Sequence, residues 1–117
     1  LMDQAARDRL ARHRTVDMTT VGRQSGEPRT IEIWWFHFEG RFIVTGTPGR
    51  RHWLANVRSD PRVVVEVDGM RVEATATEIS DEGFRRRFFS AADPRWYRSQ
   101  VELERLVAEA PMIDLDF

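Results

Sequence analysis

The sequence predicts a mainly β (α+β) fold, in which about six antiparallel strands close into a barrel with short helices around it. Three observations predict it. The chain of 117 residues has room for one core, runs of β-branched and aromatic residues recur along it, and glycine-containing turns join these runs. Closure into a barrel is expected because it removes the exposed edges of the sheet. We therefore expect a single domain over residues 1–117.

Five runs have the composition of strands, and a sixth strand is expected at the end of the chain. The turns Ser25-Gly26, Glu39-Gly40 and Asp68-Gly69 lie between neighbouring runs, and Asp-Gly is a strong signal for a two-residue hairpin. Short turns join antiparallel neighbours. The expected strands are Val16–Val21, Thr30–Phe38, Phe42–Thr47, Val63–Val67, Val72–Ile79 and Met112–Phe117.

Helical periodicity accounts for the remaining segments. Thr47 and Ser80 are suited to cap the second and third helices, and the last segment is expected to be continuous until Pro111 stops it. We expect Phe84, Phe88 and Phe89 to face the core, and Trp96, Leu103, Leu106 and Val107 to share one side of the last helix. The expected helices are Asp3–Arg14, Arg51–Arg58, a segment that follows Ser80, and Pro94–Ala110.

The strand Ile31 to Phe38 is apolar on both faces, because Ile31, Ile33 and Trp35 alternate with Trp34, Phe36 and Phe38. One face should pack inside the barrel. The other face needs cover from the C-terminal helices or from a second subunit, since so large an aromatic strip is rarely exposed. We expect a homodimer to supply that cover.

Composition excludes several classes of function. The net charge of −1 gives no broad attraction for nucleic acid or an anionic membrane, and no run approaches the length of about eighteen apolar residues that a membrane span needs. No secretory leader is evident, so a cytoplasmic location is expected. The absence of cysteine and lysine excludes thiolate and Schiff-base chemistry. His13, His37 and His52 lack metal-site spacing, and no metal site is expected. Redox chemistry would have to come from a cofactor.

Two turns have the residues of an anion site. In Gly22 to Arg29, two glycines, a serine and two arginines are the ingredients of a phosphate cradle, although a solvated polar hairpin has the same composition. In Thr47 to His52 a strand gives way to a helix N-terminus, where capping alone would explain the residues. Two such turns in one small, nearly neutral domain favour a phosphorylated ligand.

The run Thr19–Arg29, TTVGRQSGEPR, resembles the TTxGRKSGxPR signature of the deazaflavin-dependent nitroreductase family. Looser similarities follow in the same order, and together they cover roughly residues 16 to 89. Gln24 stands where the family usually has lysine, and the loop from Thr47 to Trp53 is shorter than in its better-known members. The looser segments are Gly40–Val44, Thr47–Gly49, Trp53–Val57 and Asp60–Val63.

The resemblance implies a split β-barrel related to flavin-binding pyridoxamine 5'-phosphate oxidase-like proteins. It also implies an oxidoreductase that passes a hydride from reduced deazaflavin F-420 to a small organic acceptor, such as a quinone, a nitro compound or an unsaturated carbonyl. The ring would carry the two-electron chemistry, because no side chain is a convincing nucleophile or proton donor. Two alternatives stay open: an FMN-dependent reductase of the same fold, and a non-catalytic protein that binds a flavin, haem or fatty-acyl ligand.

Carried over residue by residue, the resemblance implies a cofactor site and a substrate side. We expect the pocket to lie beside Trp34, under the Trp96–Tyr97 region or a partner chain. The catalytic candidates are Thr47, Trp34 and Tyr97. The cofactor-binding candidates are Arg23, Gln24, Ser25, Gly26 and Arg29 at the phosphate, Thr47, Gly49 and Arg50 in the loop, and Trp53 and Asn56 on the helix.

Overall fold

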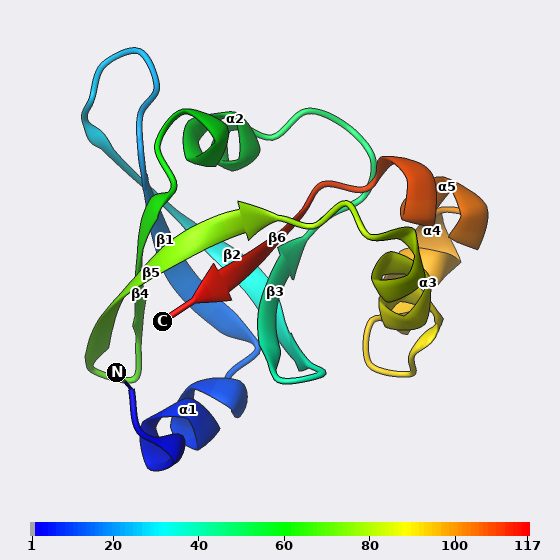
Figure 1. Cartoon of the computed structure of the whole chain (residues 1–117), viewed down its shortest axis with the longest axis horizontal. Helices are drawn as coiled ribbons and strands as arrows, with labels where there is room; N and C mark the ends of the chain where they lie inside the picture. The colour runs from blue at the N-terminus through cyan, green and yellow to red at the C-terminus, as the bar shows by residue number, and fades with distance from the viewer. Residues whose placement is uncertain (1) are drawn as a thin grey trace.

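A computed structural model describes residues 2–117 and has six antiparallel strands that close into a barrel. Neighbouring strands follow the order β1, β2, β3, β6, β5, β4, and β4 pairs back with β1 (Figure 1). With five short helices around it, this is the split barrel that the sequence predicts. The strands are β1 Thr15–Val21, β2 Pro28–Phe38, β3 Arg41–Thr45, β4 Arg62–Val67, β5 Met70–Glu78 and β6 Met112–Asp116.

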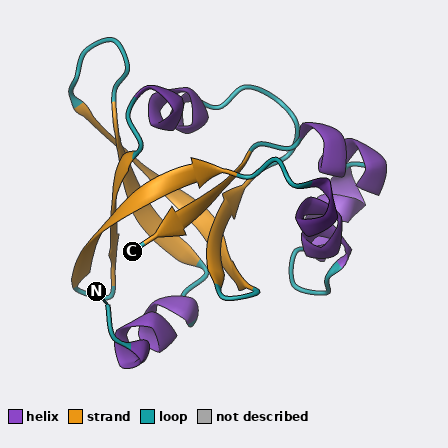
Figure 2. Cartoon of the chain, viewed as in Figure 1, coloured by secondary structure: helices purple, strands orange, loops and turns teal. Residues whose placement is uncertain are grey.

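The helices lie around the barrel at three places (Figure 2). One lies at the end of the barrel near the N-terminus, a second lies at the opposite end, and the other three group together against one side. Among residues 2–117, no helix has the length and apolar character to cross a membrane. The helices are α1 Gln4–Ala11, α2 His52–Ser59, α3 Glu82–Ser90, α4 Arg95–Gln100 and α5 Leu103–Glu109.

Two of the predicted hairpins have the backbone that a tight turn requires. Between β2 and β3, Glu39 and Gly40 have φ of 50° and 76°, and between β4 and β5, Asp68 and Gly69 have φ of 52° and 72°. Two successive residues with positive φ match the right-handed twist of the strands, which is why Asp-Gly is favoured there.

Strand β2 separates two apolar cores. Trp35 is 1% exposed inside the barrel, and the next residue, Phe36, is 3% exposed on the outside under the C-terminal helices. The ring centroid of Phe36 lies 5.4 Å from that of Phe88 on α3 and 5.9 Å from that of Tyr97 on α4. The C-terminal helices, and not a second subunit, therefore cover this part of β2. Trp34 stays exposed.

The C-terminal helices differ from the sequence prediction in three respects. The expected helix Pro94–Ala110 is two helices, because Val101 is extended (φ −143°, ψ 143°) and packs beside Leu103 on the outer core. Trp96 is 48% exposed and does not share the buried side of that segment. The N-cap of α3 is Asp81 instead of Ser80, and its carboxylate accepts hydrogen bonds from the first free N–H groups of the helix.

Arg85 on α3 is buried, although its side chain is charged. Its guanidinium donates to the carbonyl oxygens of Ile79 at 2.8 Å, Val107 at 2.6 Å and Ala110 at 2.5 Å. Burial lowers the pKa of this guanidinium, and the carboxylate of Glu78 opposes that shift. Arg85 thus satisfies the free carbonyls at the end of α5 and ties α5 to the end of β5.

We expect Arg85→Met to lower the free energy of unfolding by about 3 kcal/mol, because it keeps the apolar stem but leaves buried carbonyls without donors. Urea denaturation followed by circular dichroism measures this. Arg87→Met is the matched control on the same helix, where the guanidinium is exposed, pairs with Glu39 and lies 5.8 Å from the ring centroid of Phe84. Equal midpoints for the two variants would contradict the structural role of Arg85.

Candidate functional site

The turn between β1 and β2 is folded on its own backbone. Gly22 N donates to Glu27 O at 2.8 Å, and Gly26 N donates to Gly22 O at 2.8 Å. Gly26 has φ of 73°, and a Cβ on Gly22 would lie 2.8 Å from Ser25 Oγ. Both glycines are therefore required by geometry: one for its conformation, the other for the close approach of the serine.

Ser25 holds the second arginine of the turn. Its Oγ accepts from Glu27 N at 3.1 Å and from Arg29 Nη2 at 3.2 Å. The hydroxyl, the guanidinium and the backbone of the turn are thus gathered at one point, which projects from the barrel beside α2 (Figure 1).

Asn56 joins this turn to α2. The side chain is 2% exposed, its Nδ2 donates to Thr20 Oγ1 at 3.0 Å, and its Oδ1 accepts from Arg23 N at 3.2 Å and from Arg23 Nη1 at 2.9 Å. Arg23 Nη2 also lies 3.4 Å from Nδ1 of His52. One buried amide therefore fixes the position of the helix and the direction of the Arg23 guanidinium.

The turn and α2 enclose a hollow of about 440 Å³, which we call the turn hollow. Among residues 2–117, no ion pair joins Arg23 or Arg29 to a carboxylate. Two guanidiniums without counter-charges beside free hydrogen-bond donors suit a phosphate. Of the expected cofactor-binding residues, the turn hollow is lined by Arg23, Gln24, Ser25, Arg29, Trp53 and Asn56.

A second hollow of about 330 Å³, the aromatic hollow, adjoins it, and Trp53 lines both. It brings together Trp34, Thr47 and Tyr97, the three expected catalytic candidates, and Trp96 also lines it. The ring centroids of Trp34 and Trp96 are 5.7 Å apart, edge to face. Burial raises the pKa of Tyr97, while the charges of Arg14 and Arg51 act in the opposite direction.

The loop before α2 does not form the cap that the sequence suggested. Thr47 lies four residues before Arg51, which is the N-cap residue of the helix and makes no side-chain cap hydrogen bond. Instead, the Arg51 side chain folds back, and its Nη2 donates to Thr47 O at 2.8 Å and to Thr47 Oγ1 at 3.2 Å. Thr47 thus positions its loop through its acceptors and caps nothing.

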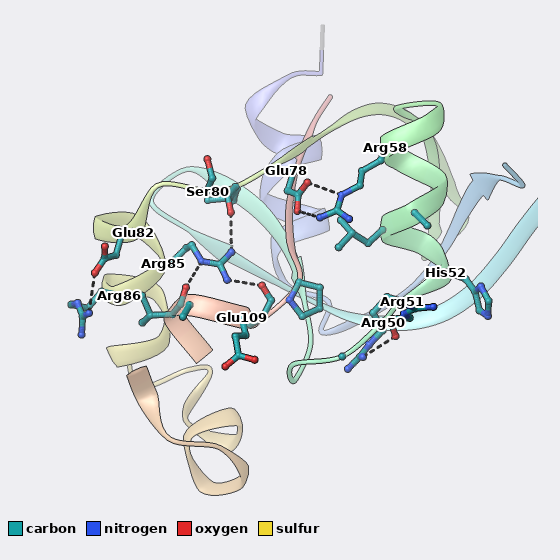
Figure 3. A pocket seen from close by; sticks show the side chains of 18 of the residues that line it. Arg50, Arg51, His52, Arg58, Glu78, Ser80, Glu82, Arg85, Arg86 and Glu109 are labelled. Atoms are coloured by element: carbon teal, nitrogen blue, oxygen red, sulfur yellow. Dashed lines mark hydrogen bonds and ion pairs between the residues drawn. The ribbon is translucent and has the colours of Figure 1, made fainter. Parts of the chain in front are cut away.

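Gly49 and Arg50 line a different hollow, the largest of the three at about 1030 Å³ (Figure 3). It lies between α2 and the α3–α5 group. Most charges in its walls are paired: Arg58 with Glu78 at 2.6 Å, and Arg86 with Glu82 and Glu104. Gly49 and Arg50 therefore line neither the turn hollow nor the aromatic hollow, although Arg23 and His52 line both the largest hollow and the turn hollow.

Sequence reasoning did not select three residues that build the site: Thr20, Arg51 and His52. Thr20 is the second threonine of the signature, so its position was available as a signal. Arg51 and His52 were visible only as cations before a helix. No group of three or more histidine, cysteine or acidic side chains in residues 2–117 is arranged to hold a metal ion.

A family model described as F420H(2)-dependent quinone reductase matches residues 5–107 of the chain. Solved structures share the fold. An F420-H2 dependent reductase has a TM-score of 0.64 at 20% identity, with 89% of this chain and 95% of that one covered.

Two further structures have comparable similarity. A protein described as a domain-swapped dimer has a TM-score of 0.66 at 18% identity, over 97% of this chain and 95% of its own. A putative pyridoxamine 5'-phosphate oxidase from Listeria innocua has a TM-score of 0.68 at 16% identity, over 95% and 89%. At these identities the structures establish the fold, and the family model establishes the family.

We expect Asn56→Ala to lower the free energy of unfolding by about 2 kcal/mol, because Thr20 and the Arg23 backbone would lose their buried partner. Chemical denaturation measures this, with Ser59→Ala at an exposed position of the same helix as control. An unchanged stability would show that the amide does not anchor α2.

Proposed function

Because the chain belongs to the F420H(2)-dependent quinone reductase family, we propose that it transfers a hydride from reduced deazaflavin F-420 to a small organic acceptor held in the aromatic hollow. Membership makes the protein an F-420-dependent oxidoreductase. The acceptor and the roles of individual residues are the proposed part. One observation carries them: two unpaired guanidiniums meet α2 at a hollow that shares Trp53 with the aromatic hollow.

The residues of the turn hollow fit a phosphate group. Arg23 and Arg29 would supply charge, Ser25 a hydroxyl, and Gln24 an amide where a lysine would add a third charge. The tight backbone at Gly22 and Gly26 keeps these groups in place before a ligand arrives. Asn56 is a positioning residue here, because it directs Arg23 through two hydrogen bonds.

The aromatic hollow would take the ring and the acceptor. When bound, the deazaflavin supplies the two-electron chemistry. The indole of Trp53 is 6% exposed and would form the wall that orients the ring, and Thr47 would line its side. Trp34 and Trp96 would exclude water from the acceptor side, since both are large and apolar, line this hollow and stay exposed.

Tyr97 is the candidate hydrogen-bond donor to the acceptor. Burial raises the pKa of its hydroxyl, so the group keeps its proton at neutral pH. Quinones, nitro compounds and unsaturated carbonyls are flat, conjugated molecules with an oxygen that accepts a hydrogen bond. This common chemistry suits an aromatic mouth with one phenol. We also propose that this oxidoreductase is located in the cytoplasm.

We expect the wild-type protein to quench deazaflavin fluorescence on binding and to bind deazaflavin more tightly than FMN. We expect Arg23→Ala to weaken deazaflavin binding at least tenfold without loss of thermal stability. Arg71→Ala, the same charge change at the exposed β4–β5 hairpin, is the matched control. Gln24→Lys should tighten binding and make it more sensitive to salt. Tighter binding of FMN would favour the FMN-dependent alternative. Binding of deazaflavin without turnover of any acceptor would favour a non-catalytic protein.

We expect Trp34→Ala to reduce turnover of a quinone more than it reduces cofactor affinity, because Trp34 lies on the proposed acceptor side. Measuring both constants tests this, and a large loss of affinity with normal turnover would reverse the assignment.

The exposed side chains of Ile31, Trp34 and Trp96 also support the proposed homodimer. Sedimentation of the same proteins at micromolar concentration tests it, and a monomeric wild type would remove it.

A further inference from the structure

Arg51 makes more contacts with its loop than the hydrogen bonds to Thr47. Its guanidinium lies against the backbone of two glycines: a Cβ on Gly46 would lie 2.9 Å from its Nη2, and a Cβ on Gly49 would lie 3.1 Å from its Nη1. Besides the two acceptors of Thr47, it donates to Arg50 O at 3.1 Å. Every acceptor is neutral, so the hydrogen bonds hold the loop without neutralising the charge.

That charge lies at the wall of the aromatic hollow. Arg51 lines this hollow on one side and the largest hollow on the other, where Figure 3 shows it beside Arg50 at the start of α2. Within residues 2–117 it makes no ion pair. Tyr97 lines the same hollow, and the charge of Arg51 opposes the rise that burial causes in the pKa of Tyr97.

The other charged groups around the aromatic hollow do not cancel Arg51. Glu32 on β2 is exposed, so water screens its carboxylate, whereas the side chain of Arg51 is half-buried. Tyr97 is neutral below its raised pKa, and Arg14, whose charge also acts on Tyr97, is paired with the carboxylate of Asp93. Arg50, His52 and Arg23 stand at the neighbouring hollows and carry no negative charge.

We propose that Arg51 is a positioning residue with an electrostatic role: it latches the Gly46–Arg50 loop over the ring site and presents an uncompensated positive charge to the ring. The proposal rests on the proposed function, because it places the ring in the aromatic hollow. A cation beside a bound heterocycle favours the protonation state with more negative charge, and charge near the ring nitrogens tunes the chemistry of a flavin-type cofactor. Arg51 therefore lowers the pKa of the bound ring.

Three variants separate the latch from the charge. Arg51→Met keeps the apolar stem but loses the hydrogen bonds to the loop and the positive charge. Arg51→Lys keeps the charge but loses the planar fork of donors. Arg71→Met is the control that removes the same charge from the exposed β4–β5 hairpin. The rate of hydrogen exchange over residues 46–50 in the cofactor-free proteins measures how firmly Arg51 holds the loop. The absorbance of bound oxidised deazaflavin, followed as pH is varied, gives the pKa of the ring and so measures the effect of the charge.

We expect faster exchange of the loop in Arg51→Met and Arg51→Lys, and no change in Arg71→Met. The pKa of the bound ring should be about one unit higher in Arg51→Met than in the wild type. In Arg51→Lys, which keeps the charge, the pKa should lie close to the wild-type value. Faster exchange with an unchanged pKa would reduce Arg51 to a structural role and overturn the proposal, as would unchanged exchange. If Arg51→Met does not fold, an exchange rate or a pKa in Arg51→Lys that departs from these expectations overturns it.

A different result would contradict the proposed function: the wild-type protein would bind no deazaflavin at all. If the wild type binds and the pKa of the ring is the same in all variants, the function stands and the role of Arg51 falls.

Discussion

The hydrogen bonds of Asn56 set the geometry of the candidate site. Apolar contacts of Trp53, Leu54 and Val57 hold α2 on the end of the barrel, but apolar contacts are non-directional and would tolerate rotation or sliding of so short a helix. A buried amide with specific partners does not, because any shift leaves polar groups unpaired in a medium of low dielectric constant. The side chains that α2 presents, Arg51, His52 and Trp53, take their places from this constraint.

Local chemistry accounts for the parts of the fold that the sequence could predict. The Asp68-Gly69 hairpin, the strand composition and the apolar faces of β2 act over a few residues, and each appears in the structure. The break at Val101 could not be predicted, because Val101 and Leu103 continue a plausible helical pattern. Packing on the outer core decides that the backbone is extended there, and packing depends on residues far away in the chain.

The site divides in the same way. The signature turn contains its own glycines, serine and arginines, so its shape follows from adjacent residues, and the spacing of Trp53 and Asn56 puts both on the same helix. Arg85 and Arg51 escaped prediction because an arginine between helical apolar positions normally faces water. Both instead bind backbone carbonyls, and carbonyls are present in every sequence. Nothing in a sequence marks which of them will be left free by the fold.

Charge distinguishes this site within a fold that hosts several chemistries. The chain has a net charge of −1, and eight arginines are paired with carboxylates across the described surface, so its average field attracts no anion. Arg23, Arg29 and Arg51 are held by neutral acceptors instead: an amide, a hydroxyl and backbone carbonyls. Neutral acceptors fix a guanidinium in position and leave its charge available. Such an arrangement concentrates positive potential around the start of α2, which is where an anionic cofactor would need it.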